Sequence, residues 1–246
     1  MRFQDKTAIV TGAAGGIGRE TALRFARESA NVAVVDIDPK KLEKVVAEIR
    51  KAGGTVLPFV ADIAHYDAVR SISDRVIAKF GRIDILVNNA GAGWHHQIPF
   101  KDTSPGDWEW ILDVNLKGTL YFTHAVLDTM TSRQYGRIIN VASIAARAGI
   151  PNLAVYAASK GAMVSFTKSL AMELGPSHIT VNCVSPGLVA HETEPPRPCG
   201  GTFLGRKGRP EEFASVIAFL ASDEASFITG ADYLVDGGRT LGPRGA

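Results

Sequence analysis

The sequence has few cysteines and no long hydrophobic run. Its 246 residues include two cysteines, Cys183 and Cys199, which form neither a CxxC pair nor the Cys/His spacing of a zinc site. A disulfide framework and a metal site are therefore not predicted, and a reducing compartment fits best. No segment reaches the roughly 18 consecutive apolar residues that a membrane helix requires, and the apolar stretch near the N-terminus is too short for a secretory signal. We expect a cytoplasmic protein with no membrane partner.

A strong excess of charge of one sign is also missing. The chain has 27 Lys and Arg residues against 25 Asp and Glu residues, a net charge of +2, which gives no reason to expect a nucleic-acid partner. Hydrophobic residues make up 46% of the chain and charged residues 21%. Both values are near globular averages, which argues against a disordered tail, a collagen-like fibre or a coiled coil.

Short β-branched runs alternate with amphipathic stretches of helical spacing. The runs occupy 8–10, 32–35, 56–60, 85–87, 138–141, 180–184 and 233–235. Because they lack polar alternation, they indicate strands covered on both faces. The clearest helical stretches supply the long crossovers of parallel pairing and occupy 40–51, 65–80, 108–130, 153–174 and 210–220. This order predicts an α/β fold of the Rossmann type, a doubly wound, seven-stranded parallel sheet flanked by helices on both faces.

No change of composition, linker or repeat divides the chain, which predicts one domain over 1–246. The segment 188–208 differs from the rest because its prolines and glycines cannot hold a regular helix or a central strand. A loop of this length in a compact α/β domain is more often functional than accidental. We expect it to be a substrate loop.

A glycine-rich turn follows the first predicted strand and runs from Thr11 to Gly18. Glycines between a strand and a helix let backbone N–H groups approach a pyrophosphate, whose charge the helix N-terminus favours. The spacing is T-G-x-x-x-G-x-G rather than G-x-G-x-x-G, so a plain turn is the alternative. The motif alone favours a nucleotide only modestly.

Asp36 ends the second predicted strand, where a dinucleotide-binding fold places an acid against the adenosine ribose. The alternative is that Asp36 caps the next helix, but Asp38, directly before Pro39, is the better cap candidate. A ribose 2′-phosphate beside Asp36 would meet a like charge, at a cost of about 1 to 3 kcal/mol per unit charge at ~5 Å and an effective dielectric of ~20 to ~80. Ile37 offers no compensating cation, so NAD is expected over NADP.

Tyr156 and Lys160 lie at positions i and i+4 of a predicted helix, on one face. A free Tyr has a pKa of about 10, and lowering it toward neutrality requires about 3 to 4 kcal/mol. One cation ~5 Å away at an effective dielectric of ~20 contributes ~3 kcal/mol. We therefore expect Lys160 to supply nearly all of the free energy that this lowering of the Tyr156 pKa requires. The alternative is a core tyrosine beside a surface lysine.

With these motifs in this order, the chain resembles the short-chain dehydrogenase/reductase family over essentially its whole length. The other matching motifs are Asp62-Ile63, Asn88-Asn89-Ala90-Gly91, Asn115 within Val114–Gly118, Ser143 ahead of Tyr156, Pro186-Gly187 and Val235-Asp236-Gly237-Gly238. The resemblance implies a catalytic tetrad of Asn115, Ser143, Tyr156 and Lys160. It implies cofactor contacts from Gly12, Gly15, Gly16, Ile17, Gly18, Asp36, Asp62, Ile63, Asn89, Ala90, Gly91, Tyr156, Lys160, Pro186, Gly187 and Val189.

The resemblance also implies a role for each tetrad residue. Tyr156 would be the general acid/base and Ser143 would bind the same substrate oxygen. Lys160 would lower the Tyr156 pKa and bind the nicotinamide ribose, while Asn115 would hold a water of the proton relay. His191 stands where the family commonly has a Thr near the carboxamide, with Thr193 two positions later. Relatives are typically homotetramers built through the two long helices, here 108–130 and 153–174.

Three functions are open at this point. The preferred one is an NAD-dependent oxidoreductase that transfers a hydride between NAD(H) and a secondary alcohol or ketone. The second is a 3-oxoacyl-thioester reductase that works in the reductive direction. The third is a nucleotide-sensing module without turnover, which retention of both Tyr156 and Lys160 argues against.

Several other residues have simpler interpretations. A pocket contact is open to Trp94, His95 and His96, but no metal spacing links the histidines to His191 and Cys199. We expect Arg147 and Arg197 to be solvated surface charges, and Trp108 and Trp110 to pack within helices. We expect His178 to lie in a turn and Cys183 in the core of a strand.

Overall fold

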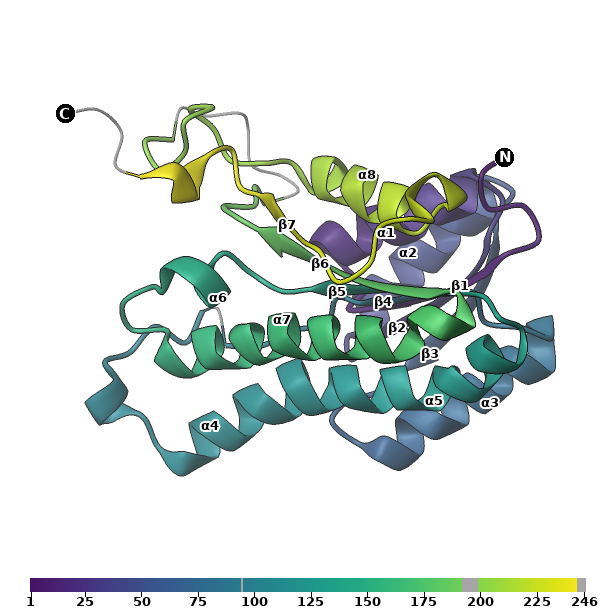
Figure 1. The fold of residues 1–246 in the computed structure, drawn as a ribbon, viewed down its shortest axis with the longest axis horizontal. Helices are drawn as coiled ribbons and strands as arrows, with labels where there is room; N and C mark the ends of the chain where they lie inside the picture. Colours follow the sequence, from purple (N-terminus) through teal and green to yellow (C-terminus); the bar gives the residue numbers. More distant parts are fainter. Residues whose placement is uncertain (94, 192–198, 243–246) are drawn as a thin grey trace.

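The computed structural model describes residues 1–93, 95–191 and 199–242 and contains one sheet of seven parallel strands (Figure 1). The strand order is β3-β2-β1-β4-β5-β6-β7. The strands are β1 (Thr7–Thr11), β2 (Asn31–Asp36), β3 (Thr55–Val60), β4 (Ile85–Asn88), β5 (Gly136–Val141), β6 (Ile179–Pro186) and β7 (Asp232–Val235). The order reverses between β1 and β4, and this confirms the predicted doubly wound sheet.

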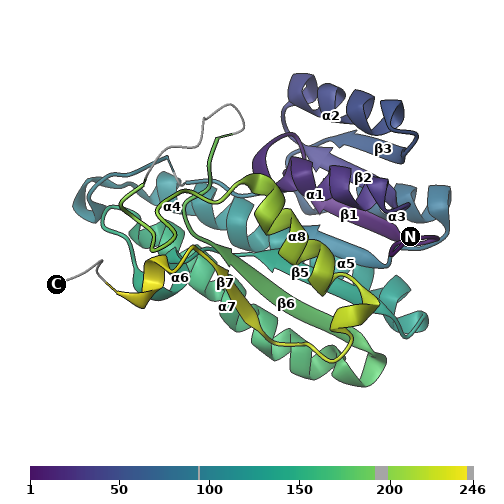
Figure 2. The same ribbon diagram turned by 90° about the horizontal axis from the view of Figure 1, so that it is seen from above.

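Helices cover both faces of the sheet (Figures 1 and 2). One face carries α1 (Gly16–Arg27), α2 (Pro39–Lys51) and α8 (Pro210–Leu220). The other face carries α3 (Tyr66–Phe80), α5 (Gly118–Ser132) and α7 (Ala154–Leu174), with α4 (Pro105–Leu112) ahead of α5 and the short α6 (Ala145–Ala148) ahead of α7. Single helical turns complete the described chain: η1 (Phe100–Asp102), η3 (Gly175–Ser177), η4 (Asp223–Ala225) and η5 (Arg239–Leu241).

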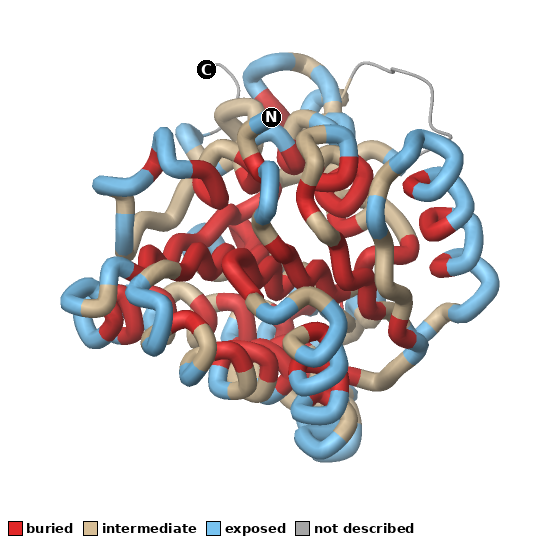
Figure 3. Tube along the Cα trace, turned by 90° about the vertical axis from the view of Figure 1, so that its right-hand side faces the viewer, coloured by how far each residue is buried: buried red, intermediate tan, exposed pale blue. Residues whose placement is uncertain are grey.

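Two apolar clusters form the core, one on each side of the sheet. Successive residues of β1 point to opposite faces, so Val10 packs in the cluster with α1, α2 and α8, while Ile9 packs in the cluster with α3, α5 and α7. Figure 3 shows the buried residues gathered along the sheet and the inner faces of the helices. The expectation of strands covered on both faces is therefore correct for the central strands.

That expectation is wrong for the two edge strands. In β3 only Phe59 is buried, and Val60 is 59% exposed; in β7 no residue is fully buried. Pro58 gives the reason for β3, because a residue without a backbone N–H is tolerated at the edge of a sheet. An apolar run does not report how many neighbouring strands or helices will cover it.

The helix predicted over 108–130 is not one regular helix. It begins at Pro105, after the Ser104 N-cap, and is interrupted by a π-helical segment, η2 (Asp113–Lys117), which leads into α5. A π turn inserts one extra residue and is frequent at functional sites. Apolar spacing does not reveal it, because the periodicity resumes on either side. Asn115 lies in this turn and is fully buried.

The segment 188–208 forms no helix or strand over its described residues, as predicted; Val189 and Gly208 make an isolated parallel bridge. Pro195, Arg197 and Thr193 lie outside the described residues, as does Trp94. No helix within the described ranges is long and apolar enough to cross a membrane.

Candidate active site

The glycine-rich turn lies between the carboxyl end of β1 and the N-terminus of α1. Gly12 has a φ of +63°, which side chains rarely adopt, and Gly15 is the N-cap of α1 without a side-chain cap. Gly18 packs so closely on this turn that a Cβ there would lie 2.1 Å from the Gly12 carbonyl oxygen. Helix α1 therefore begins inside the motif, at Gly16, rather than after it, and Ile17 packs against the core.

Hydrogen bonds of Asn89 and Thr11 hold this turn against the residues that follow β4. The Asn89 Nδ2 donates to the carbonyl oxygens of Thr11 and Gly12, both at 3.0 Å. The Thr11 Oγ1 accepts from the backbone N–H groups of Asn89 and Ala90, again at 3.0 Å. The motif does not indicate that Thr11 binds the backbone after β4. The hydroxyl of its side chain is the only sign of this role in the sequence.

The Asp36 carboxylate faces the same turn. It accepts hydrogen bonds from the backbone N–H groups of Ala14 at 2.9 Å and Asp38 at 3.0 Å. Asp38 caps α2 by accepting from Lys40 and Lys41, which confirms its predicted role and leaves Asp36 free of capping. The side chain of Ile37 is 67% exposed, and no basic side chain forms an ion pair with Asp36 among the described residues.

Asp62 and Ile63 follow β3 but differ in exposure. The Asp62 Oδ1 accepts from the backbone N–H of Ala64 at 2.9 Å. The Ile63 side chain is buried in the core, and a Cβ on Gly118 would lie 2.6 Å from its Cδ1. The predicted contact of Asp62 and Ile63 with an adenine remains a prediction.

Ser143 and Tyr156 meet at the carboxyl end of β5. Both are buried, and the Ser143 hydroxyl lies close enough to the phenol to oppose the rise that burial causes in the Tyr156 pKa. Ser143 follows β5, while Tyr156 lies in the first turn of α7, and the short α6 joins them. Because the β5 edge and the glycine-rich turn lie at the same end of the parallel sheet, a dinucleotide bound at that turn points toward this pair.

Lys160 lies one turn beyond Tyr156 on α7 and is almost completely buried. Its Nζ donates to the carbonyl oxygen of Val141 at 2.9 Å, lies 3.6 Å from the Met163 Sδ, and is 6.0 Å from the centroid of the Tyr156 ring. A Cβ added to Gly91 would lie 3.3 Å from both this Nζ and the Asn115 Oδ1. Gly91 thus leaves room where Lys160 and Asn115 converge.

Burial dominates the electrostatics of this pair. It raises the pKa of Tyr156, and the hydrogen bond from Ser143 opposes that rise. It also lowers the pKa of Lys160 to about 8. The expectation that Lys160 by itself nearly suffices to acidify the phenol is therefore wrong for the protein without cofactor, because removing both groups from water disfavours both charged forms.

Asn115 connects the π turn to α7. Its Oδ1 accepts from the Ala92 N–H at 2.7 Å, and its Nδ2 donates to the Ala92 carbonyl at 3.0 Å and to the Ser159 Oγ at 2.9 Å. The Ser159 hydroxyl in turn donates to the Tyr156 carbonyl at 2.7 Å. The amide therefore joins the loop after β4 to the turn that carries Tyr156. Ser159 is a functional residue that the motifs did not indicate, and its place directly before Lys160 is its one signal in the sequence.

Strand β6 ends at Pro186, and Gly187 and Val189 follow it. The Pro186 carbonyl accepts from the Ile144 N–H at 3.1 Å, which holds the segment after Ser143 against β6. A Cβ on Gly187 would lie 2.7 Å from the Asp236 Cα. His191 is exposed. Pro186 thus bonds to the residue that follows Ser143, and the cofactor contacts of Pro186, Gly187 and Val189 remain predictions.

A narrow recess opens beside Tyr156. Among the residues that line it are Gly93, His96, Phe100, Trp108, Ile111 and Leu153. The Trp108 ring stacks on Phe100 with centroids 5.5 Å apart, and its Nε1 donates to the Thr103 Oγ1 at 2.7 Å. The recess gives this site a mainly apolar wall in addition to its polar pair.

Four other sequence interpretations have structural outcomes. Trp110 is 48% exposed, and its ring makes an edge contact with His96 at a centroid distance of 6.1 Å. Arg147 is not simply a solvated charge, since its Nε donates to the buried Asp232 carboxylate at 2.8 Å. His178 occupies a left-handed turn and Cys183 is buried in β6, as predicted. No cluster of metal-binding side chains occurs in the part of the chain that the structure describes.

Comparisons with known proteins agree with this geometry. A family model described as Enoyl-(Acyl carrier protein) reductase matches residues 12–240. The 3-oxoacyl-[acyl-carrier-protein] reductase FabG of Thermotoga maritima is 39% identical, over 98% of this chain and all of its own. The cyclopentanol dehydrogenase of Comamonas testosteroni is 38% identical, over 97% of this chain and 98% of its own.

Solved structures are similar over the same span. An NAD⁺-bound xylitol dehydrogenase superposes with a TM-score of 0.90 at 34% identity, covering 97% of this chain and all of its own. A 3-ketoacyl-(acyl-carrier-protein) reductase from Brucella melitensis, complexed with NADH, superposes with a TM-score of 0.89 at 36% identity, covering 96% of this chain and 99% of its own.

Proposed function

The chain belongs to the short-chain dehydrogenase/reductase family, and we propose that it is an oxidoreductase that transfers a hydride between NAD(H) and a secondary alcohol or ketone. The observation that carries this proposal is the buried group of Ser143, Tyr156 and Lys160, in which the Lys160 Nζ lies 6.0 Å from the centroid of the Tyr156 ring. All three are buried at the carboxyl edge of the sheet, at the end where the glycine-rich turn meets α1.

The described residues fit a nicotinamide dinucleotide. The uncapped N-terminus of α1 and the positive φ of Gly12 form a cradle that fits a pyrophosphate. Asp36 would accept from the ribose hydroxyls, and it supports NAD over NADP because its charge repels a 2′-phosphate. NAD-bound relatives agree with this choice. When bound, the nicotinamide accepts a hydride from the carbinol carbon or, when reduced, returns one to the carbonyl.

The protein's own residues would handle the proton. In oxidation, ionised Tyr156 accepts the proton of the substrate hydroxyl, while Ser143 donates a hydrogen bond to the same oxygen. Because burial raises the pKa of Tyr156, the phenol is expected to reach its working pKa only in the complex with the oxidised, positively charged cofactor. Lys160, with a pKa of about 8, is mainly protonated at neutral pH and can bind the ribose and assist this ionisation. Asn115 would position a relay water.

Reduction of a 3-oxoacyl thioester is the second candidate. It rests on the two relatives named as 3-oxoacyl and 3-ketoacyl reductases, whose identities of 39% and 36% match those of the alcohol and polyol dehydrogenases. The same tetrad serves both directions, because Tyr156 donates in reduction the proton that it accepts in oxidation. The two candidates therefore differ in substrate rather than in chemistry.

The arrangement of the chain in the cell is part of the same proposal. We infer one catalytic domain over 1–246, with 188–208 as its substrate loop, in a cytoplasmic homotetramer. The interface would use α4 with α5 and α7, where Met172 is exposed on the outer face of α7. Light scattering coupled to gel filtration would measure the mass directly, and a monomer would contradict the tetramer without affecting the chemistry.

A spectrophotometric screen tests the function. Secondary alcohols, polyols, ketones and a 3-oxoacyl thioester are assayed with NAD(H) and NADP(H) at 340 nm. We expect turnover with NAD(H), and Tyr156→Phe should lower it by about 10² to 10⁴. Tyr135→Phe is the matched control. Tyr135 lies directly before β5, at the end of the sheet opposite to Tyr156, and its hydroxyl donates to Asp223. Full activity in Tyr156→Phe would refute the assigned proton transfer.

A further inference from the structure

A second hollow, of about 340 Å³, lies beside α6. Its walls come from three segments that are distant in sequence: 144–150, 200–203 and the C-terminal turn 239–242. Figures 1 and 2 show η5 next to α6, at the end of the molecule where α7 begins. Neither the glycine-rich turn nor the tetrad lines this hollow.

Among the described residues that line this hollow, Arg239 is the one with a charged side chain. The Arg239 Nη1 donates to the Gly201 carbonyl at 2.9 Å, and this contact depends on Gly201, because a Cβ there would lie 2.3 Å from Nη1. Arg239 forms no ion pair with any described residue. Nearby arginines differ: Arg147 pairs with Asp232, and Arg206 pairs with Glu212. A guanidinium has five N–H donors, so most of those of Arg239 remain for a ligand.

The nearest acid in sequence does not neutralise this cation. The Asp236 carboxylate is held within its own turn, where it accepts from the Gly238 N–H at 2.8 Å and from the Thr240 N–H and hydroxyl at 2.9 and 2.7 Å. These bonds direct both of its oxygens toward the backbone of the turn. The hollow therefore has one positive side chain, and the other described residues that line it are uncharged.

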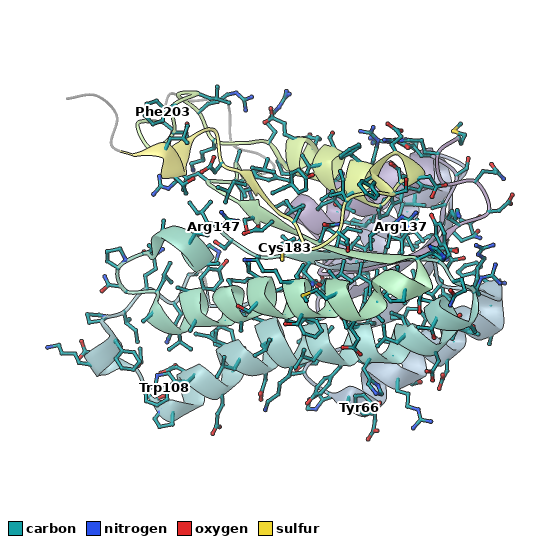
Figure 4. All side chains as sticks on the ribbon, in the orientation of Figure 1. Tyr66, Trp108, Arg137, Arg147, Cys183 and Phe203 are labelled. Atoms are coloured by element: carbon teal, nitrogen blue, oxygen red, sulfur yellow. The ribbon has the colours of Figure 1, made fainter. Side chains whose placement is uncertain are left out.

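Residues of one stretch of chain line both the hollow and the recess of the active site. Ile144, directly after Ser143, lines the hollow, and so do Gly149 and Ile150. A few residues later, Leu153 and Tyr156 line the recess. A substrate that uses the hollow would place its oxygen at Ser143 and Tyr156 and extend along this stretch toward Arg239. Figure 4 places Phe203, on the opposite wall, and Arg147 of α6 at the same end of the molecule.

We propose that this hollow binds the anionic end of the substrate, a carboxylate or a phosphate, through Arg239. The inference rests on the proposed oxidoreductase function and names its substrate class: a secondary alcohol or ketone with an aliphatic spacer and a terminal anion. Ile144, Ile150 and Phe203 provide apolar contact for the spacer. The guanidinium of Arg239 matches the planar, two-oxygen geometry of a carboxylate or a phosphate face.

The test compares acids with their neutral esters. Hydroxy acids that carry a secondary hydroxyl next to the terminal methyl group, from 3-hydroxybutyrate to 9-hydroxydecanoate, are assayed beside their methyl esters. At the best chain length we expect kcat/KM for the acid to exceed that for the ester at least tenfold. Arg239→Gln should bring this ratio to about one and leave the ester rate within twofold. Arg206→Gln, which removes the same charge from a paired arginine close by, should leave the ratio unchanged.

One further variant and two outcomes decide whether Arg239 binds the anion. Gly201→Ala keeps the charge but displaces the guanidinium, so it should lower the acid-to-ester ratio as Arg239→Gln does. A ratio near one in the wild type at every chain length would overturn the inference and leave the proposed function intact. An equal loss for acid and ester in Arg239→Gln would also overturn it, since it would show that Arg239 only supports 200–203.

A separate binding measurement tests the hollow even if the proposed function is wrong. If no alcohol or ketone is turned over, calorimetric titration of inorganic phosphate into the same protein, with NADH present to occupy the glycine-rich turn, still examines the hollow. Binding by the wild type that Arg239→Gln abolishes and Arg206→Gln retains would support an anion site. Equal binding by all three proteins, or none by the wild type, would overturn it.

Discussion

The Lys160 ammonium lies 6.0 Å from the centroid of the Tyr156 ring, yet it donates its hydrogen bond to the Val141 carbonyl at the end of β5. The i, i+4 spacing places both side chains on one face of α7, as expected. Burial then works against both charged forms, raising the pKa of Tyr156 and lowering that of Lys160 to about 8. The charged pair is therefore costly to maintain before the cofactor binds.

This cost predicts a pH-dependent stability. Below pH 8 the amine is protonated in both the folded and the unfolded protein, and the folded state bears the cost of the buried charge. Between about 8 and 10.5 the folded protein releases the proton first, so the free energy of unfolding contributed by Lys160 rises with pH. Lys160→Met should therefore be more stable than the wild type at pH 7, by up to about 3 kcal/mol, while its turnover is lost.

Urea unfolding of both proteins from pH 7 to pH 10 measures this difference. The gap between the two free energies should shrink as the pH passes 8, because only the wild type loses the buried charge. A gap that does not change over this range would show that the Lys160 pKa is not depressed in the folded protein.

Asp36 predicts the cofactor preference. Asp36→Asn removes the charge and keeps one of the two acceptor oxygens, so that one of the backbone bonds from Ala14 and Asp38 is retained. Relieving a like-charge repulsion of about 1 to 3 kcal/mol should shift the ratio of kcat/KM values toward NADP by about tenfold to a hundredfold. Asp38→Asn makes the same charge change two residues away and still caps α2, so its ratio should stay near that of the wild type. An unchanged ratio in Asp36→Asn would place the ribose elsewhere.

Arg147 predicts an asymmetric effect on stability. The arginine side chain is 46% exposed, but the Asp232 side chain that it pairs with is 1% exposed and also accepts from the Ser185 hydroxyl at 2.6 Å. Arg147→Ala leaves that carboxylate buried and unpaired and should cost about 1 to 3 kcal/mol. The double variant Arg147→Ala/Asp232→Asn removes the stranded charge and should recover part of the loss. A double variant less stable than the single one in urea would contradict this account.

Gly18 predicts a packing requirement at the cofactor turn. A Cβ at this position would lie 2.1 Å from the Gly12 carbonyl oxygen and 2.5 Å from the Asn89 Nδ2. Gly18→Ala should therefore displace the turn, weaken NADH binding at least tenfold by fluorescence titration, and lower stability by about 1 to 3 kcal/mol. Gly175→Ala is the control, since nothing lies within 4 Å of a Cβ there and no loss is expected. NADH affinity equal to that of the wild type would exclude this close packing.

The sequence predicted the regular elements well for a physical reason. Periodicity and capping are local properties, so the seven strands and most of the helices follow from spacing, and Asp38 caps α2 as its place before Pro39 indicated. The π turn at Asn115 did not follow, because it depends on the amide binding the backbone of Ala92, 23 residues earlier. The exposure of β3 and β7 likewise depends on which strands become the edges.

The order of motifs by itself determined the doubly wound sheet and the glycine-rich turn, and it named the four residues of the predicted tetrad. Only the tertiary structure decided that Ser143, Tyr156 and Lys160 are buried together, that burial rather than Lys160 dominates the pKa of the phenol, and that Arg147 pairs with Asp232. It also decided that Arg239 lines a hollow beside α6. These facts depend on distances between segments far apart in the chain and on how much water packing removes, and neither quantity is encoded in local spacing.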